Sequence, residues 1–575
     1  MAFQIQNGVL TKYTEDGNTE VIVPEGVTVI GDDAFNTCKT ITRVTLPMGI
    51  KCIGERAFYW CKSLEGINIP EGVTSIGEEA FKFCSRLAEI TLPDSLANIG
   101  ESAFDECGSL LSIAIPEGIE SLGYEVFADC RRLKNVKLPD SLTHIGKYAF
   151  RNCTSLEEIN IPKGVTSIGY QTFEKTPWLE NNPHEMLTVG DGILLRYKGD
   201  KETPVIADSI RYIAPGAFKD CMNLKSITLP EGITSISEWA FAQSGLSKIS
   251  LPQSLEVIED FAFLGSELSE INLPRRLKSI GGLAFSECKK LKSINVPESV
   301  SEIGVRAFMG CTELERINIP QNIRYIYAET FGSCESLTSI TLSEGLTAIA
   351  ERTFFGCKKL EKVNIPDNVT SIGNSAFCGC SRLAGIDIPE GVSEIGRNAF
   401  ADCSGLRNVN IPDSVAKIGS NAFGNCFHIK NFTVNIDGVS VHIDAHGILA
   451  AKEDISNVVE MLLANDFSVR MSHVIKFKVI FDYYLDTGNA ESEKYIKKNF
   501  MKLMEQLIDE SDTDRIKKAC ENTSLISDRN IDKLIEYAEE TERYTKKTEI
   551  RELLEEQKKR SGKDFFNKRL DRISI

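Results

Sequence analysis

A short pattern of hydrophobic and polar positions recurs along the first three quarters of the chain. Apolar Ile67 and Ile69 alternate with polar Asn68, a Pro-x-Gly step follows, and the phrase ends in Ala-Phe-x-x-Cys. Alternation over a few residues is typical of a strand that is buried on one side, and Pro-x-Gly is typical of a turn. Each phrase therefore predicts a short strand, a turn, a second extended piece and a helical turn.

The phenylalanine of each phrase sets the repeat length. Its copies are 23 residues apart, with two steps of 22 and one gap of 45, and they are Phe35, Phe58, Phe81, Phe104, Phe127, Phe150, Phe173, Phe218, Phe241, Phe263, Phe285, Phe308, Phe331, Phe354, Phe377, Phe400 and Phe423. One repeat buries only about eight apolar side chains, which is too few to offset the conformational entropy lost when it becomes ordered. Neighbouring repeats must therefore stack into a solenoid.

Departures from the period divide the chain. We expect an N-terminal strand cap at 1–22, a first array at 23–173, an irregular insert at 174–206, a second array at 207–426, a terminal β-hairpin cap at 427–447 and a helical C-terminal domain at 448–575. The phrase Asn7-Gly8-Val9-Leu10 returns as Asp191-Gly192-Ile193-Leu194, so both segments are expected to be strands that open an array. The insert is predicted to be an irregular rung of one continuous solenoid. The alternative is a hinge or docking site that contains Trp178.

Beyond the second array the period changes. Asp437-Gly438 lies between two apolar stretches, which is a strong signal for a hairpin turn. Helical spacing of apolar residues then appears around 455–463 and 496–507, and further helices are expected at 512–521, 528–541 and 546–560. These segments predict an all-α tail.

The cysteines belong to the repeat. All of the 17 except Cys52, Cys378 and Cys520 lie three residues after an anchor phenylalanine, and Thr176, Ser244 and Ser266 fill the same slot elsewhere. A slot that accepts serine or threonine indicates a small buried side chain, so we expect reduced structural thiols. Strands about 4.8 Å apart also miss the Cβ separation of about 3.8 Å that a disulfide prefers. We expect no disulfides along the ladder.

One group of residues has a spacing similar to that of a zinc finger. Cys426 and His428 are followed by His442 and His446. Because the ladder already accounts for Cys426, and the histidines fall in a predicted strand and its exit, we expect no metal site. We also expect no cofactor.

The repeated phrase L-x-x-I-x-I-P-x-x-V-x-x-I-G-x-x-A-F-x-x-C resembles the leucine-rich repeats of the BspA-like family over about residues 20–430. The resemblance implies a repeat solenoid with a ladder of short strands, a protein-binding or adhesive role, and no catalytic activity. Members of the family are often secreted surface proteins.

Charge and motifs narrow the function classes. The net charge is -17 and most of it lies in the repeat region, which disfavours phosphate binding along the array, so we expect no nucleic-acid partner. The chain contains no G-x-x-x-x-G-K-[ST], H-E-x-x-H or G-x-S-x-G motif, and we expect that it is not an enzyme. No stretch is apolar enough to span a membrane. The start lacks the pattern of a signal peptide, which predicts a cytoplasmic location; the alternative is a surface or secreted protein whose signal peptide has been removed.

A partner is expected on the exposed face of the first strand of each repeat. The position after the first Ile is almost uniformly polar, whereas the position before it varies, as a recognition surface would. The candidate partner-binding residues are Arg43, Glu89, Asn135, Glu158, Lys248, Glu270, Arg316, Lys362 and Asn408, together with Trp178 of the insert. The sequence therefore predicts a non-catalytic protein-interaction scaffold whose helical tail makes a second contact. The alternative is an adhesin that binds host protein or glycan.

Overall fold

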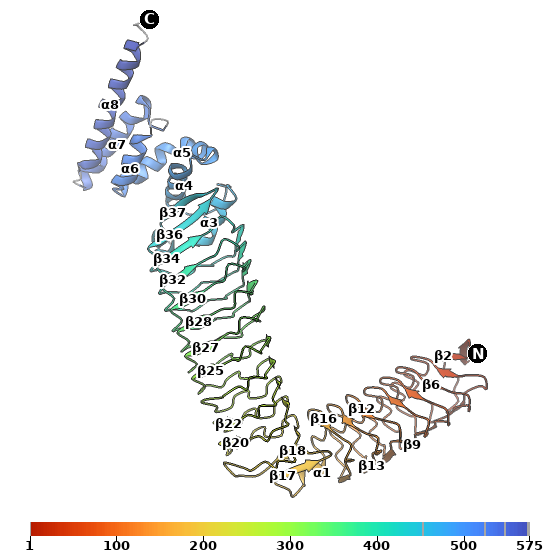
Figure 1. Cartoon of the computed structure of the whole chain (residues 1–575). Coiled ribbons are helices and arrows are strands. Elements are labelled where there is room, and N and C mark those ends of the chain that lie inside the picture. The colour runs from red at the N-terminus through yellow and green to blue at the C-terminus, as the bar shows by residue number, and fades with distance from the viewer. Residues whose placement is uncertain (1, 451–452, 523–524, 546–547, 572–575) are drawn as a thin grey trace. The chain divides into compact units, whose positions relative to one another are not determined.

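The computed structural model describes residues 2–450, 453–522, 525–545 and 548–571. It consists of two units, Met1–Glu335 and Ser336–Ile575. The predicted fold class is confirmed, because stacked repeats of short strands and turns are followed by helices (Figure 1).

In the first unit most repeats contribute two short strands, which build two ladders. The first ladder, here called the face ladder, contains β3 (Glu20–Ile22), β5 (Arg43–Thr45), β7 (Gly66–Asn68), β9 (Glu89–Thr91), β11 (Ser112–Ala114), β13 (Asn135–Lys137), β15 (Glu158–Ile159), β20 (Ser226–Thr228), β22 (Lys248–Ser250), β25 (Ser293–Asn295) and β27 (Arg316–Asn318). The second ladder contains β4 (Val29–Ile30), β6 (Cys52–Ile53), β8 (Ser75–Ile76), β10 (Asn98–Ile99), β12 (Ser121–Leu122), β14 (His144–Ile145), β16 (Ser167–Ile168), β19 (Tyr212–Ile213), β21 (Ser235–Ile236), β23 (Val257–Ile258), β24 (Ser279–Ile280) and β26 (Glu302–Ile303). Pairing between repeats is parallel and keeps equivalent residues side by side, as for Asn135 and Glu158.

The core of the array is a column of phenylalanines. Phe35, Phe58 and Phe81 are fully buried, and neighbouring ring centroids are 4.8 and 5.1 Å apart with nearly parallel planes. Stacked aromatic pairs add to the stabilisation that their buried area provides. The helical turn around each ring is closed by bonds between residues three apart, such as the Cys84 N–H to the Phe81 carbonyl at 3.0 Å. The period of 23 therefore places one ring in each repeat.

Two similar hairpins open the two arrays, and the second strand of each is the segment that the repeated phrase predicts to be a strand. β1 (Phe3–Gln6) pairs antiparallel with β2 (Val9–Tyr13), and β2 pairs parallel with β4. Likewise β17 (Met186–Val189) pairs antiparallel with β18 (Ile193–Tyr197), and β18 pairs parallel with β19. Tyr13 packs on Phe35 at 5.0 Å and Tyr197 on Phe218 at 5.3 Å, so each tyrosine caps its phenylalanine column.

The second unit continues the same repeat. Its strands are β28 (Ser339–Thr341), β30 (Lys362–Asn364), β32 (Gly385–Asp387) and β34 (Asn408–Ile411) in one ladder and β29 (Ala348–Ile349), β31 (Ser371–Ile372), β33 (Glu394–Ile395) and β35 (Lys417–Ile418) in the other. The predicted hairpin is present: β36 (Asn431–Ile436) pairs with β34 and turns at Asp437-Gly438 into the antiparallel β37 (Val439–Ile443). Both turn residues have positive φ, as a tight hairpin turn requires.

The helices that follow are α2 (Ala445–Ala450), α3 (Ile455–Leu463), α4 (His473–Thr487), α5 (Ala490–Asp509), α6 (Thr513–Glu521), α7 (Asp528–Thr545) and α8 (Glu549–Asp571). The helical periodicity predicts five of them; α2 and α4 were not predicted. The α4 segment is rich in β-branched and aromatic residues, which have weak helix propensity, and its capping serine makes no side-chain bond. Tertiary packing overrides these local preferences, since Ile480 and Phe481 of α4 are fully buried.

Candidate functional site

The nine face-ladder residues predicted to bind a partner are all exposed. Seven of them lie in the first unit, and Lys362 and Asn408 lie in the second. Eight are the first residue of a strand; Glu270 precedes an isolated bridge between Ile271 and Ile294. The alternation along each strand therefore puts these side chains outside and the neighbouring isoleucine or valine inside, as the period of two requires.

The uniform polar position of the same strands has a structural role at two points. Asn68 Oδ1 accepts a hydrogen bond from the Leu46 N–H at 2.8 Å, and its Nδ2 donates to the Leu46 carbonyl at 3.3 Å. Asn318 makes the same pair of bonds with Val296 at 2.9 and 2.8 Å. These two amides join neighbouring repeats.

Opposite charges in neighbouring repeats meet on this face. Lys248 of β22 and Glu270 of the next repeat form an ion pair at 3.2 Å, and both side chains are about two-thirds exposed. An exposed pair of this kind contributes little to stability. It shows, however, that the variable position lets a charged residue face its counterpart one repeat away.

Three of the predicted residues converge at one place. Asn135 of β13, Glu158 of β15 and Trp178 line a hollow of about 480 Å³ together with Val136, Lys137, Ile159 and Asn160. We call this the β15 hollow. Val136 and Ile159 are buried side chains of the ladder, while Asn135 and Glu158 stand exposed beside them. The hollow therefore combines an apolar floor, charged and amide groups and one half-buried indole.

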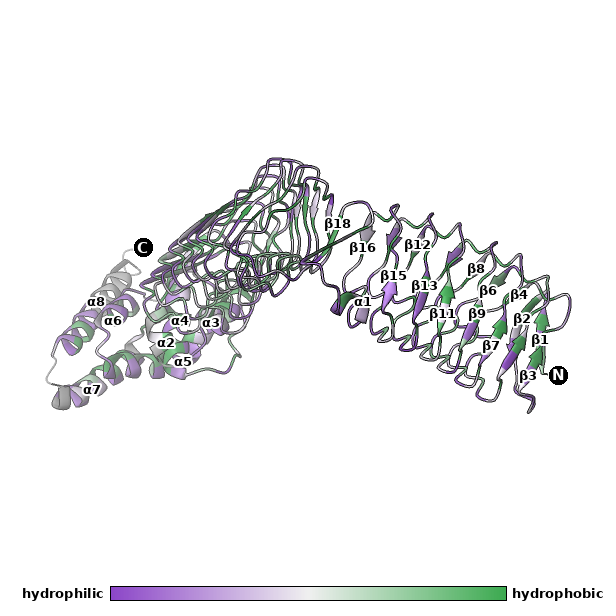
Figure 2. Cartoon of the chain, turned by 90° about the horizontal axis from the view of Figure 1, so that it is seen from below, coloured by the Kyte–Doolittle hydropathy of each residue, from purple (hydrophilic) through white to green (hydrophobic). Residues whose placement is uncertain are grey.

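A short helix brings Trp178 to this place. In α1 (Pro177–Glu180) the first residue is Pro177, and Thr176 Oγ1 accepts a bond from the Leu179 N–H at 3.3 Å. The Trp178 indole packs edge-on against Phe173 with centroids 4.7 Å apart, and its backbone N–H donates to the Leu156 carbonyl at 2.9 Å. Figure 2 shows α1 beside β15 at the end of the first array. A capping threonine before proline signals a helix start, and this signal could have revealed α1 in the sequence.

A second candidate site lies in the second unit, where the hairpin cap meets the helices. A cavity of about 350 Å³ is lined by apolar Ile443, Ile448, Val474, Ile475 and Val479 and by His442, Asp444, Gly447, Ser472, Lys478, Asp482, Glu510 and Arg515. Val474 stands at its rim with 44% of its surface exposed. No sequence pattern indicates this cavity, because its walls come from β37, α2, α4, α6 and the segment between α5 and α6.

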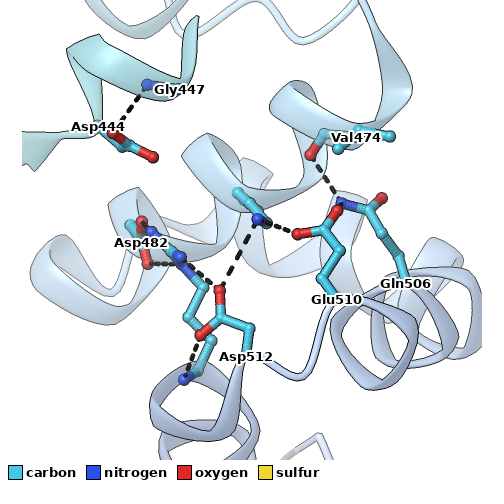
Figure 3. A network of polar contacts seen from close by, with 9 residues as sticks. Asp444, Gly447, Val474, Asp482, Gln506, Glu510 and Asp512 are labelled. Carbon is cyan, nitrogen blue, oxygen red and sulfur yellow. Dashed lines mark hydrogen bonds and ion pairs between the residues drawn. The ribbon is translucent and has the colours of Figure 1, made fainter. Parts of the chain in front are cut away.

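Charged side chains around this cavity satisfy one another (Figure 3). Arg515 binds Asp482 in a bidentate pair at 2.6 and 2.9 Å and Asp512 at 2.6 Å, while Lys478 pairs with Glu510. Burial lowers the pKa of the Arg515 guanidinium, but the hydrogen bonds and charges of Asp482 and Asp512 outweigh burial and raise its pKa above the usual value. The network therefore fixes α4 against α6.

The cysteine slots are occupied by hydrogen-bonded thiols. All 17 cysteines are reduced thiols, and Cys107 Sγ lies 3.2 Å from the Phe81 carbonyl. Burial raises the pKa of Cys107 far above its usual range and that of Cys288 to about 12, so both thiols stay protonated. Cys426 and His428, members of the zinc-like set, bind the Phe400 and Ser404 carbonyls instead. Among the described residues no cluster of three metal-binding side chains occurs.

Comparisons with known proteins agree with the repeat. The BspA type leucine-rich repeat region matches residues 12–134, 74–185, 197–315 and 301–430. No curated protein matches the chain significantly. None of the described helices is long and apolar enough to cross a membrane.

Three solved structures illustrate the similarity. A leucine-rich repeat protein from Bacteroides ovatus is 29% identical over 75% of this chain and 91% of its own, with a TM-score of 0.29. A leucine rich cell surface protein from Faecalibacterium prausnitzii is 26% identical over 74% and 90%, also with a TM-score of 0.29. The pneumococcal vaccine antigen PcpA is 22% identical over 70% and 93%, with a TM-score of 0.34. On the repeat match, which covers most of the chain, the protein belongs to the BspA type leucine-rich repeat family.

Proposed function

We propose that this protein is a non-catalytic scaffold that binds a partner protein on its face ladder, with the β15 hollow at the centre of the contact. The observation that carries the proposal is the convergence of Asn135, Glu158 and Trp178 on one hollow. Leucine-rich repeat proteins are generally protein-interaction scaffolds, and an array of parallel repeats offers a long surface for contacts.

The chemistry of the hollow suits recognition. Tryptophan is enriched among the residues that contribute most binding energy at protein interfaces, above all when it lies in a pocket that excludes water. The half-buried indole of Trp178 packs on Phe173, and the backbone N–H of Trp178 donates to the Leu156 carbonyl. The indole therefore loses little conformational entropy on binding. Among the described residues Glu158 has no ion-pair partner within 4 Å, which leaves its charge available.

The helical tail is proposed to make a second contact. Its cavity joins apolar walls to the Arg515 and Lys478 network, and Val474 presents an apolar side chain at the rim. A tail that is fixed at this cavity could hold a second partner while the array holds the first.

Affinity capture with the full chain tests the proposal. Trp178→Ala should weaken the affinity for a partner captured from an extract of the native cells by about thirtyfold or more, since removal of a tryptophan at the centre of an interface costs about 2 kcal/mol or more. Trp60→Ala is the matched control, because Trp60 is also on the first array but lies away from the hollow, 40% exposed. Equal recovery by both variants and the wild type would remove the hollow from the proposed function.

Charge reversal tests the face more widely. Reversing Glu89, Glu158 and Glu270 together should abolish capture if the partner lies along the face ladder. Unchanged capture would move the site to the turns or the tail. Recovery that depends on Val474 but not on the three glutamates would indicate that the tail is the principal site.

The alternative function is an adhesin that uses the same face to bind host protein or glycan. Fractionation of the native cells separates the two functions: the scaffold requires the protein in the cytosol with free thiols, and the adhesin requires it at the surface or in the medium. The cytoplasmic location stays a prediction, with the surface as its alternative.

A further inference from the structure

The face ladder is interrupted at β15. The sheet order β11-β13-β15 ends there, and in the described residues β13 is the only strand that pairs with β15. The chain continues into α1 instead of a next strand, and only the Trp178 N–H extends the ladder, to the Leu156 carbonyl. The β15 hollow therefore lies beside the edge where a strand of the next repeat would stand.

Some repeats of the ladder are joined by a forward backbone hydrogen bond after the strand. The Ile115 N–H donates to the Lys137 carbonyl of the next repeat at 2.9 Å, as the Leu229 N–H does to Ser250, whereas Ile69 and Leu138 make no such bond among those described. Ile161 is the counterpart of Ile115 two repeats later, and β15 differs from these strands in having no paired strand on its forward side among the described residues. An edge strand with free N–H and C=O groups is a template for another extended chain.

A strand edge elsewhere in the protein is covered. In the second unit the corresponding ladder does not end at β34, because β36 pairs with β34 and the antiparallel β37 pairs with β36. Among the described residues β15 has no such strand on its free side. Its edge is thus open at the same place where Trp178 and Glu158 line a hollow.

The side chains of β15 indicate which residues an added strand would place beside them. Lys248 and Glu270 show that a lysine on one strand pairs with a glutamate at the same position of its neighbour at 3.2 Å. The residue of an added strand that lies beside Glu158 would therefore be lysine or arginine, in keeping with cross-strand charge pairing. The next residue, beside Ile159, would point inward toward the Trp178 indole and would be apolar.

We propose that the β15 edge binds an extended segment of the partner protein as an added strand, with a basic side chain beside Glu158 and an apolar one against Trp178. This mode of recognition combines backbone hydrogen bonds with pockets for alternate side chains. The inference rests on the proposed function and specifies the class of partner for the same hollow.

The chain supplies a suitable probe. Residues 246–251, Leu-Ser-Lys-Ile-Ser-Leu, form the strand that carries Lys248. The Lys248 N–H points back to the preceding repeat and donates to the Lys225 carbonyl at 3.1 Å, whereas the N–H groups of inward residues point forward. In the probe, N-methylation of the lysine should therefore remove a bond to β15, and N-methylation of the isoleucine should not.

Binding of the labelled peptide to the full chain, measured by fluorescence anisotropy, tests the inference. We expect saturable binding, weakened about tenfold or more by methylation of the lysine nitrogen and changed less than about twofold by methylation of the isoleucine nitrogen. Glu158→Lys should weaken binding about fivefold and should favour a peptide with glutamate in place of lysine. Glu89→Lys, on the same face but away from the open edge, is the control. It should change neither the affinity for the lysine peptide nor the preference between the lysine and glutamate peptides.

Failure of the strand-addition proposal can be distinguished from failure of the proposed scaffold function. Equal binding of both methylated peptides, or no binding of the unmodified peptide while partner capture still depends on Trp178, would overturn strand addition and leave the scaffold proposal standing. Partner capture that is indifferent to Trp178 would overturn the proposed function itself, whatever the peptide does.

Discussion

The thiol of Cys130 lies 3.2 Å from the carbonyl oxygen of Phe104, a residue 26 positions earlier, in the preceding repeat. The same bond recurs along the array, for example from Cys61 to Phe35 and from Cys153 to Phe127. Burial raises the pKa of Cys130 well above its usual range, so the thiol remains a donor at neutral pH. The repeated cysteine is therefore a hydrogen-bonding link between neighbouring repeats.

Two replacements of Cys130 separate the contribution of the side chain's volume from that of its hydrogen bond. We expect Cys130→Ala to lower the free energy of unfolding by about 1–2 kcal/mol, because it removes the bond and leaves a small cavity. Cys130→Ser keeps a small buried donor and should cost less; the natural Ser244 fills the same slot and donates to the Phe241 carbonyl of its own repeat. Urea titrations of both variants measure the difference. A serine variant that is less stable than the alanine variant would contradict the linking role.

The paired asparagine bonds make a second prediction. Asn68→Ala should lower the free energy of unfolding by about 1–2 kcal/mol, since both bonds to the Leu46 backbone are lost. Asn295→Ala is the control, because Asn295 holds the same position in its repeat and makes no side-chain hydrogen bond among those described. Equal losses in the two variants would show that the amide pairs contribute nothing specific.

Stability near Asp105 should depend on pH. Burial raises the pKa of Asp105 to about 6, and this outweighs the favourable ion pair with Lys82 at 3.2 Å. Burial lowers the pKa of Lys82, but its hydrogen bonds to Glu79 and Asp105 outweigh burial and hold this pKa above the usual value. Asp105 is therefore the member of the pair whose charged form is destabilised by burial. A folded-state pKa above the unfolded value of 3.8 stabilises the fold below about pH 4, and this contribution is lost as the pH rises through 6.

Asp105→Asn should therefore gain about 1 kcal/mol relative to the wild type between pH 4 and pH 7.5. Parallel urea titrations at the two pH values measure the gain, with exposed Asp94→Asn as the control. If the difference between the Asp105→Asn variant and the wild type were constant across this range, the buried carboxylate would not be the cause.

The regular part of the fold follows from the sequence, because one phrase repeats and each position has one role. Phe104 and Cys107 are buried for the same reason as their counterparts in other repeats, and their spacing alone predicts it. The hairpin at Asp437-Gly438 and the strand that ends at Tyr197 are also predicted, since each has a local signal.

The site was predicted only in part. Alternation along the strands predicts that Asn135 and Glu158 are exposed, but the approach of Trp178 to both depends on α1, a four-residue helix outside the period. Helix α4 was missed because its β-branched residues favour a strand locally and only burial against neighbouring helices stabilises it. The cavity of the tail depends on α4, so no sequence pattern could indicate it.

The charge network of the tail gives a further prediction. Arg515→Met should lower the free energy of unfolding of the helical region by about 2 kcal/mol, because Asp482 and Asp512 lose their shared partner in a partly buried place. Arg560→Met removes an exposed pair with Glu556 on one helix and should cost less than about 0.5 kcal/mol. Thermal unfolding followed by circular dichroism compares the two. Similar losses would mean that the network does not fix α4 against α6.

Hydrogen exchange with and without the captured partner tests the location of the binding site most directly. The account predicts slower exchange of backbone amides in residues 134–161 and 176–181, around the β15 hollow, with little change in the strands of β5 and β7. Protection that is confined to residues 473–521 or to the turns of the array, with none at β13, β15 and α1, would contradict it.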